Sequence, residues 1–245
     1  MYDYFILFFL VAFLSIVIGT VAGFGTSTIF LPAALFFIDF KTALVLVAVT
    51  HLSANLGATT FFRHGLDKRL ILLFGVPSIF ITIIGAYMVA YVPQTILIII
   101  LGIFLLLFSI LFLSKPDYKV PKSETNTIIG GAISGFLQGL LGIGGPLRGA
   151  FLISYDLDRF KYIATLAAIA VIIDITRIPI YISNNLLEPQ YYIYIPVLIV
   201  LGITGSYIGK RIVVFIPQDV FKRVVLVAIG IASLVLILGG LNHII

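Results

Sequence analysis

The chain has no cysteine and few charged residues, and both features narrow its possible functions. Among its 245 residues 10% are charged and 61% are hydrophobic, whereas a soluble domain has about 25% charged and about 45–50% apolar residues. A soluble chain of this length could not bury so much apolar surface. The absence of cysteine excludes disulfides, thiolate nucleophiles, zinc-thiolate sites and iron–sulfur clusters. We therefore expect a membrane protein without a metal site or cofactor.

Signatures of several other functions are also missing. The sequence has no G-x-x-x-x-G-K-[ST] motif for ATP and no row of acidic residues typical of a cation filter. Its polar side chains form no recognisable nucleophile–base constellation, so we do not expect an enzyme. The pI of 9.4 comes from basic residues spread over short loops, without the basic helix or patch that nucleic-acid binding needs.

Apolar runs divide the chain into ten predicted helical segments. The first is interpreted as a membrane segment rather than a signal peptide, because Asp3 is the only charge before it. The second and seventh are too short to span a membrane comfortably, and each follows a glycine cluster, as in a discontinuous or re-entrant helix. The segments cover residues 4–22, 27–38, 42–61, 70–91, 95–113, 127–141, 146–155, 162–183, 191–207 and 219–239.

The order of several residues indicates an internal duplication. Asp39, Asn55 and Pro77 recur at one constant spacing as Asp158, Asp174 and Pro196. Glycines follow the same order, with Gly19 and Gly23 corresponding to Gly135 and Gly139. The sequence therefore predicts two repeats, residues 1–126 and 127–245, each made of a short broken pair followed by three full-length helices.

The distribution of basic residues predicts the topology. The loops at one end hold every Lys and Arg except Lys41, Arg148 and Arg177, and by the positive-inside rule this end is cytoplasmic. Both termini are then extracytoplasmic, and equivalent helices run in opposite directions, so the repeats are inverted. The residues of this basic end are Arg63, Lys68, Arg69, Lys115, Lys119, Lys122, Arg159, Lys161, Lys210, Arg211, Lys222 and Arg223.

The glycine clusters predict half of a binding site. Gly25, followed by Thr26 and Ser27, and Gly144 with Gly145 stand directly before the short segments. Two half-helices that start near the membrane centre would direct unpaired N–H groups and partial positive charge at an anion. We expect Thr26 and Ser27 to cap the first of these helices. The alternative is that these glycines only allow close helix packing, which is the interpretation favoured for Gly19, Gly23, Gly135 and Gly139.

Three charged residues fall inside the predicted segments, where an unpaired charge costs about 2.5–3.5 kcal/mol. Asp174 and Arg177 are spaced i,i+3 on one helix and can pair. They either neutralise each other as a structural staple, or Asp174 orients Arg177 toward a substrate. Arg148 has no acidic residue within a helical turn, so it either binds an anion or extends to the cytoplasmic surface.

Two neutral amides and one histidine extend the candidate site. His51 and Asn55 lie one turn apart on the third segment, and His51 could carry a proton. Gln138 lies beside the second glycine cluster. Each of these residues either binds a ligand or forms polar contacts between helices.

Three stretches carry a resemblance to a known family. GFGTSTIFLP at residues 23–32 and GFLQGLLGIGGP at 135–146 resemble the two signatures of the TauE/SafE-like sulfite-exporter and toluenesulfonate-uptake permeases, and FRHGLD at 62–67 resembles the loop after their third segment. The chain departs from the first signature at Thr26 and Ser27, where many members have further glycines. The resemblance implies a multi-pass transporter of sulfur-containing oxyanions or organosulfonates.

The sequence thus predicts an all-α, multi-pass protein of the cell membrane with two inverted repeats of about five segments each. We expect a secondary transporter that moves sulfite, sulfoacetate or another sulfonate by alternating access at the repeat interface, with a proton or sodium as a possible coupling ion and a homodimer as a possible assembly. The alternatives are a carrier of carboxylates or other small anions and a non-transporting membrane subunit.

Overall fold

The computed structural model describes residues 2–61, 65–213 and 215–242, and its regular structure is entirely helical. All ten predicted segments are helices, which confirms the all-α prediction. Ten α-helices and two short 3₁₀ helices lie within the described residues: α1 (Tyr2–Ala22), α2 (Thr26–Ala34), α3 (Phe40–Phe61), α4 (Lys68–Tyr91), α5 (Gln94–Ser114), α6 (Glu124–Leu141), α7 (Gly145–Leu152), η1 (Ile153–Tyr155), α8 (Arg159–Ser183), η2 (Pro189–Tyr191), α9 (Tyr194–Ile212) and α10 (Gln218–Asn242).

Seven helices in the described part of the chain are long and apolar enough to cross a membrane. They are α1, α3, α4, α5, α8, α9 and α10. Large apolar side chains point outward from them, and Leu72, Phe80 and Leu107 are 62%, 64% and 62% exposed. Such surfaces are costly in water but match lipid tails. As predicted, α2 with nine residues and α7 with eight are too short to span.

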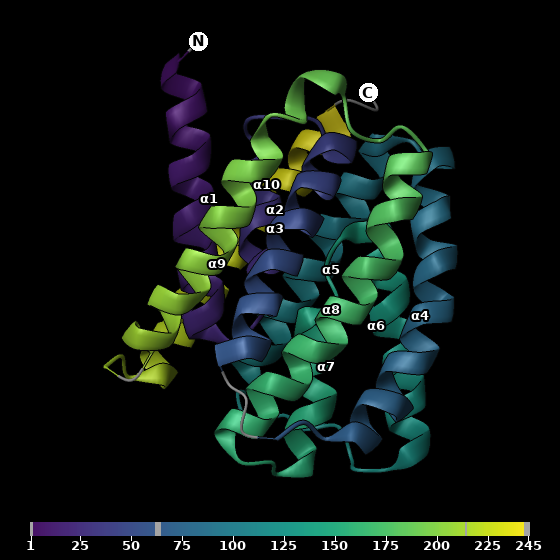
Figure 1. Cartoon of the computed structure of the whole chain (residues 1–245), viewed down its shortest axis with the longest axis vertical. Coiled ribbons are helices and arrows are strands. Elements are labelled where there is room, and N and C mark those ends of the chain that lie inside the picture. Colours follow the sequence, from purple (N-terminus) through teal and green to yellow (C-terminus); the bar gives the residue numbers. More distant parts are fainter. Residues whose placement is uncertain (1, 62–64, 214, 243–245) are drawn as a thin grey trace.

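The long helices alternate between two ends of the bundle (Figure 1). α4, α6, α8 and α10 begin at the lower end, whereas α3, α5 and α9 begin at the upper end, where α1 also starts and α10 finishes. This arrangement matches the predicted grouping of loops. Arg63 and part of the 62–67 stretch lie outside the described residues.

Side-chain caps fix three of the helix starts at the lower end. The side chains of Asp67, Ser123 and Asp158 accept hydrogen bonds from first-turn N–H groups of α4, α6 and α8, as N-cap residues do. Lys161 Nζ lies 3.3 Å from an oxygen of Asp67. Partial burial acts to raise the pKa of Asp67, but the Leu70 N–H and Lys161 outweigh it and hold that pKa below its usual value. Asp67 is therefore charged at neutral pH and joins the starts of α4 and α8.

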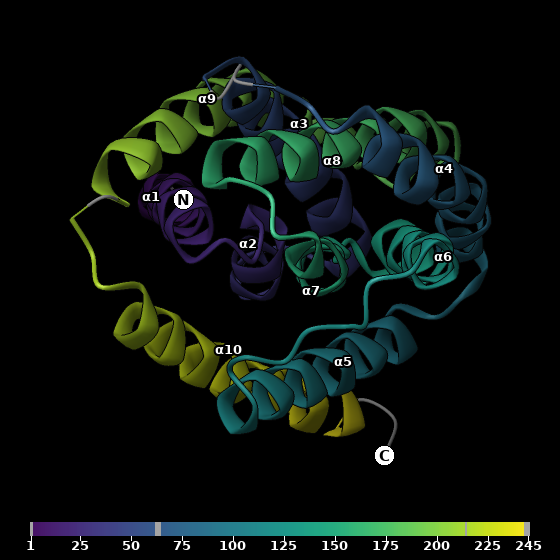
Figure 2. The same cartoon turned by 90° about the horizontal axis from the view of Figure 1, so that it is seen from below.

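The two short helices lie in the middle of the bundle, where they contact each other (Figure 2). The longer helices surround them in pairs: α4 packs on α6, α9 on α1, α5 on α10, and α3 on both α8 and α9. α3 is the most enclosed of the membrane-length helices, with 72% of its apolar stretch buried. The polar residues Thr50, His51 and Ser53 of α3 are buried and therefore face protein rather than lipid.

Glycines bring α4 and α6 into close contact. A methyl group on Gly135 would lie 2.5 Å from the carbonyl oxygen of Ser78, and one on Gly139 would clash with the carbonyl oxygen of Thr82. Thr82 Oγ1 uses this proximity to donate to the carbonyl of Gly135 at 2.9 Å. The packing interpretation is confirmed for both α6 glycines.

Gly19 and Gly23, for which close packing was also predicted, differ in their surroundings. A methyl group on Gly19 would lie 2.7 Å from Thr26 Cα, so Gly19 packs α1 against α2 as predicted. The packing interpretation is wrong for Gly23, around which there is open space. Gly23 has φ 74° and Gly25 has φ 86°, so both glycines serve the turn that reverses the chain between α1 and α2.

Several predicted segment ends differ from the structure by three to five residues, and at two of them apolar residues lie outside the helix. α2 finishes at Ala34 and continues as a turn rather than as helix to residue 38. The segment predicted from residue 191 begins as the 3₁₀ helix η2, and α9 proper runs from Tyr194 to Ile212. In both places apolar residues continue beyond the helix, so an apolar run alone does not define its end.

Substitutions in α4 test the close contact with α6. A methyl group on Gly85 would lie 2.5 Å from the carbonyl oxygen of Phe136, whereas one on Gly75 meets nothing within 4 Å. Gly85→Ala should therefore destabilise the protein by about 1–3 kcal/mol through overpacking. Gly75→Ala is the matched control and should be neutral or stabilising, because alanine favours helix. The measurement is the unfolding temperature in detergent, and equal temperatures for the two variants would contradict the packing model.

Candidate functional site

The starts of the two short helices face each other at the centre of the molecule. Gly25 precedes α2 and Gly144 precedes α7, and neither helix has a side-chain cap. A methyl group on Gly145 would lie 2.7 Å from the carbonyl oxygen of Phe24 and 3.5 Å from Gly25 Cα. The two glycine motifs are thus in direct contact, and only residues without side chains allow this approach.

A cavity of about 340 Å³ extends from these helix starts toward the lower end of the bundle. Tyr162, Lys210 and Lys222 line it together with the glycine motifs. Six of the predicted site residues also line it: Gly25, Thr26, His51, Asn55, Gly145 and Arg148.

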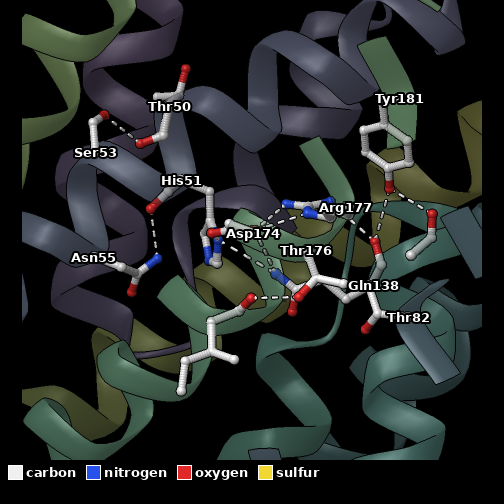
Figure 3. Close-up of polar contacts among 12 residues, drawn as sticks. Thr50, His51, Ser53, Asn55, Thr82, Gln138, Asp174, Thr176, Arg177 and Tyr181 are labelled. Carbon is white, nitrogen blue, oxygen red and sulfur yellow. Dashed lines mark hydrogen bonds and ion pairs between the residues drawn. The ribbon is translucent and has the colours of Figure 1, made fainter. Parts of the chain in front are cut away.

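A buried carboxylate organises the polar residues behind this cavity (Figure 3). Asp174 is 0% exposed. Its Oδ2 lies 2.6 Å from His51 Nδ1, and its Oδ1 accepts from Arg177 Nε at 2.8 Å and from Gln138 Nε2 at 3.3 Å. Asp174 therefore joins α3, α6 and α8 through three side chains.

Gln138 extends the cluster to the second short helix. Its amide NH₂ donates to Asp174, and its Oε1 accepts from Arg148 Nη1 at 3.2 Å. The carboxylate and the guanidinium fix the orientation of the amide, because one can only accept and the other can only donate. Arg148 is thereby connected to Asp174 through a single side chain.

Arg177 is fully buried among protein groups. Besides the ion pair with Asp174, its Nη1 donates to the backbone carbonyl of Gln138 at 3.1 Å. Its guanidinium lies 5.8 Å from the centre of the Tyr181 ring, and the Tyr181 hydroxyl donates to the carbonyl of Gly139. Arg177 does not line the cavity. This geometry favours the counter-ion interpretation over direct contact with a substrate.

Arg148 differs from Arg177 in facing the cavity. It is 3% exposed and lines the cavity wall, and its Nε has no hydrogen-bond partner in the described part of the chain. It does not extend to the surface. A buried charge with an unused donor needs a compensating group, which an anion in the cavity would supply.

The hydroxyl groups after Gly25 do not cap α2, so that prediction is wrong. Gly25 itself occupies the N-cap position, and Thr26 is the first helical residue. Thr26 Oγ1 and Ser27 Oγ are buried without hydrogen-bond partners among the described residues. Of the two, only Thr26 lines the cavity.

The remaining predicted residues take different places. Asn55 lines the cavity, but its Nδ2 donates to the His51 backbone carbonyl one turn earlier. Gly144 lies behind the cavity, where a methyl group would come within 2.6 Å of Gln138 Oε1. Asn55 is thus hydrogen-bonded within its own helix, and Gly144 allows Gln138 to lie close to the start of α7.

Sequence reasoning missed some members of this region. Tyr181 lies one helical turn after Arg177, and this spacing could have indicated a contact between the two side chains. Lys210 and Lys222 were assigned only to the basic end. Their proximity to the cavity depends on the packing of α9 and α10, which local sequence does not reveal.

Comparison with protein families places this arrangement in context. The family model described as "Sulfite exporter TauE/SafE" matches residues 8–236. The chain belongs to the TauE/SafE sulfite exporter family. No curated protein and no solved structure matches it significantly. The resemblance carried by the glycine motifs is thereby confirmed, and the protein is a multi-pass membrane transporter of this family.

Charge removal at Asp174 tests the role of the buried ion pair. Asp174→Asn leaves the enclosed Arg177 without its counter-charge and should destabilise this TauE/SafE protein by about 3–5 kcal/mol. The double change Asp174→Asn/Arg177→Gln removes both charges and should recover a large part of that loss. The measurement is the unfolding temperature in detergent. A double variant as unstable as the single one would show that charge pairing is not what Asp174 contributes.

Proposed function

We propose that the protein is a secondary transporter that binds a small sulfur-containing anion, such as sulfite, sulfoacetate or another organosulfonate, between the starts of α2 and α7. One observation carries this proposal. The two helix starts, the buried Arg148 and unpartnered donors on Arg148 and Thr26 meet at the inner end of one cavity.

The electrostatics of this place favour an anion. Each helix start contributes about half a positive charge and N–H groups without intrahelical partners. Arg148 adds a full charge with a planar fork that matches the paired oxygens of a sulfonate or sulfite. Because Asp174 is already paired with Arg177, the charge of Arg148 is left for a ligand.

The size of the cavity agrees with a small solute. A volume of about 340 Å³ is at the lower end of the range for ligand pockets. It holds an anion of a few heavy atoms together with some water, since one water molecule occupies about 30 Å³. The family description supports sulfur as the central element of the anion.

We further propose that residues 1–126 and 127–245 are inverted repeats, with the boundary in the first turn of α6. Exchanging α1–α5 with α6–α10 turns the α4–α6 contact into α9–α1 and the α3–α9 contact into α8–α4, and all four of these pairs are present. Equivalent helices such as α3 and α8 begin at opposite ends (Figure 1). Alternating access would then exchange the conformations of the two halves around the central short helices.

The positive-inside rule supports a cytoplasmic location for the lower end. Lys210 and Lys222 line the cavity on that side. On this orientation the structure is open to the cytoplasm, and both termini are extracytoplasmic.

The function is tested by binding and flux in proteoliposomes with sulfite, sulfate, sulfoacetate, taurine and acetate. We expect saturable transport of at least one sulfur anion and a weaker response to acetate. A preference for acetate would favour the carboxylate alternative. A response to none of the anions would favour a non-transporting membrane subunit and would remove the proposal.

Arg148 should account for much of the anion affinity. Arg148→Gln removes a charge-assisted hydrogen bond, and its loss should weaken binding by about 1.5–3 kcal/mol, roughly ten- to a hundred-fold. Arg148→Lys keeps the charge but not the fork, so its affinity should be intermediate. The control is Arg69→Gln, which removes an exposed arginine paired with Glu124 and should leave the affinity unchanged. Unchanged affinity in Arg148→Gln would place the anion elsewhere.

Cysteine labelling tests the proposed orientation, since the chain has no native cysteine. Single substitutions Asp3→Cys, Glu188→Cys and Asn242→Cys should react with an impermeant reagent from outside the cell. Lys68→Cys, Lys119→Cys and Lys210→Cys should react only after permeabilisation. Labelling of the positions 68 and 188 from the same side would exclude the inverted arrangement.

A further inference from the structure

The two ring nitrogens of His51 have different partners. Nδ1 lies 2.6 Å from Asp174 Oδ2. Asp174 also accepts from Arg177 and Gln138, so it is an acceptor toward each of them. Nδ1 therefore carries a hydrogen and donates it, which in a neutral imidazole leaves the lone pair on Nε2.

The free nitrogen of His51 faces the proposed anion site. His51 lines the cavity, and a methyl group on Gly25 would lie 3.7 Å from Nε2. Within the described residues Nε2 has no hydrogen-bond partner. This basic nitrogen is thus held beside the start of α2, where water and ions in the cavity can reach it.

The charges around His51 come from few helices. α8 supplies Asp174 and Arg177, and α7 supplies Arg148. Tyr162, Lys210 and Lys222, from α8, α9 and α10, line the same cavity. α2 and α5 contain no charged side chain, and α6 contributes the neutral Gln138. With neutral His51, the three charged residues nearest to it sum to one positive charge.

We propose that His51 is a proton-binding site coupled to the anion site, so that the protein carries a proton together with its anion. This inference rests on the proposed function. In the empty site a second positive charge on His51 is opposed by Arg148 and Arg177. A bound monoanion cancels the existing positive charge, and a dianion leaves a net negative charge that a proton on His51 neutralises. Anion and proton therefore each strengthen the binding of the other.

The proton transfer needs no change in the buried hydrogen bonds. A hydronium ion in the cavity gives its proton to the lone pair of His51 Nε2, forming an N–H bond and leaving water. Nδ1 keeps its hydrogen and its bond to Asp174, which stabilises the resulting imidazolium. The new Nε2–H group can donate to an oxygen of the anion, and the reverse transfer to water accompanies release.

Proton uptake on binding tests the coupling directly. Sulfoacetate and sulfate serve as dianions and methanesulfonate as a monoanion, each added to purified protein in weakly buffered detergent solution with a pH indicator. We expect uptake that approaches one proton per bound dianion and is smaller for methanesulfonate. Dianion affinity should weaken as pH rises, by at most about tenfold per pH unit for a single proton.

Histidine variants assign the uptake to its residue. The other two histidines, His64 and His243, lie outside the described residues, so His64→Gln/His243→Gln is the control and should keep both the uptake and the pH dependence. His51→Gln should lose both, whatever its absolute affinity.

A measurement without substitution at His51 covers the case in which His51→Gln fails to fold. In the His64→Gln/His243→Gln protein, ¹⁵N-labelled imidazole reports on His51 alone. Sulfite or sulfoacetate should move the Nε2 resonance toward the imidazolium position at constant pH. If the anions bind without proton uptake and the imidazole stays neutral, the coupling is overturned while the transporter proposal stands. If no anion binds, the proposed function itself fails.

Discussion

The structure depends on one buried carboxylate. Asp174 is completely enclosed in a bundle built to face lipid, and such a group is tolerated only when its oxygens are fully used. Arg177 on the same helix, His51 on α3 and Gln138 on α6 satisfy it. Through Gln138 and Arg148 the same network reaches α7. The network thus links α3, α6, α7 and α8 through polar contacts.

This constraint also determines the electrostatics of the cavity. Arg177 neutralises Asp174 and lies behind the cavity wall, so the charge of Arg148 is not cancelled by the protein. The short lengths of α2 and α7 place their positive ends beside Arg148 rather than at a membrane surface. In the proposed function, water solvates Arg148 while the site is empty, and a bound monoanion offsets its charge.

Local patterns predicted the helices and the glycine motifs, because apolar runs and breakers act over one or two turns. The i,i+3 pair of Asp174 and Arg177 was predictable for the same reason. The contact of His51 with Asp174 was not, since it joins residues 123 positions apart and depends on which helices become neighbours. The capping role expected of Thr26 failed because Gly25 is the N-cap residue and Thr26 is already the first residue of the helix. Local sequence patterns also do not show which helices become neighbours, so they could not predict that Gln138 lies between the guanidinium groups of Arg148 and Arg177.

The end of the bundle opposite the cavity contains a cluster of aromatic side chains. Aromatic rings from α1, α2 and α9 pack together there, with Phe8 lying 5.7 Å from Phe30 and 5.5 Å from Tyr194 between ring centres. On the proposed mechanism these rings form an apolar seal, which must separate when the site opens to the extracytoplasmic side. While the charge of Arg148 is uncompensated, moving the site past these closely packed apolar rings would be costly. The exchange therefore becomes easier once an anion, or a dianion together with a proton, has neutralised Arg148 and its surroundings. On this mechanism, the binding event that neutralises the site also lowers the energetic cost of separating the aromatic rings.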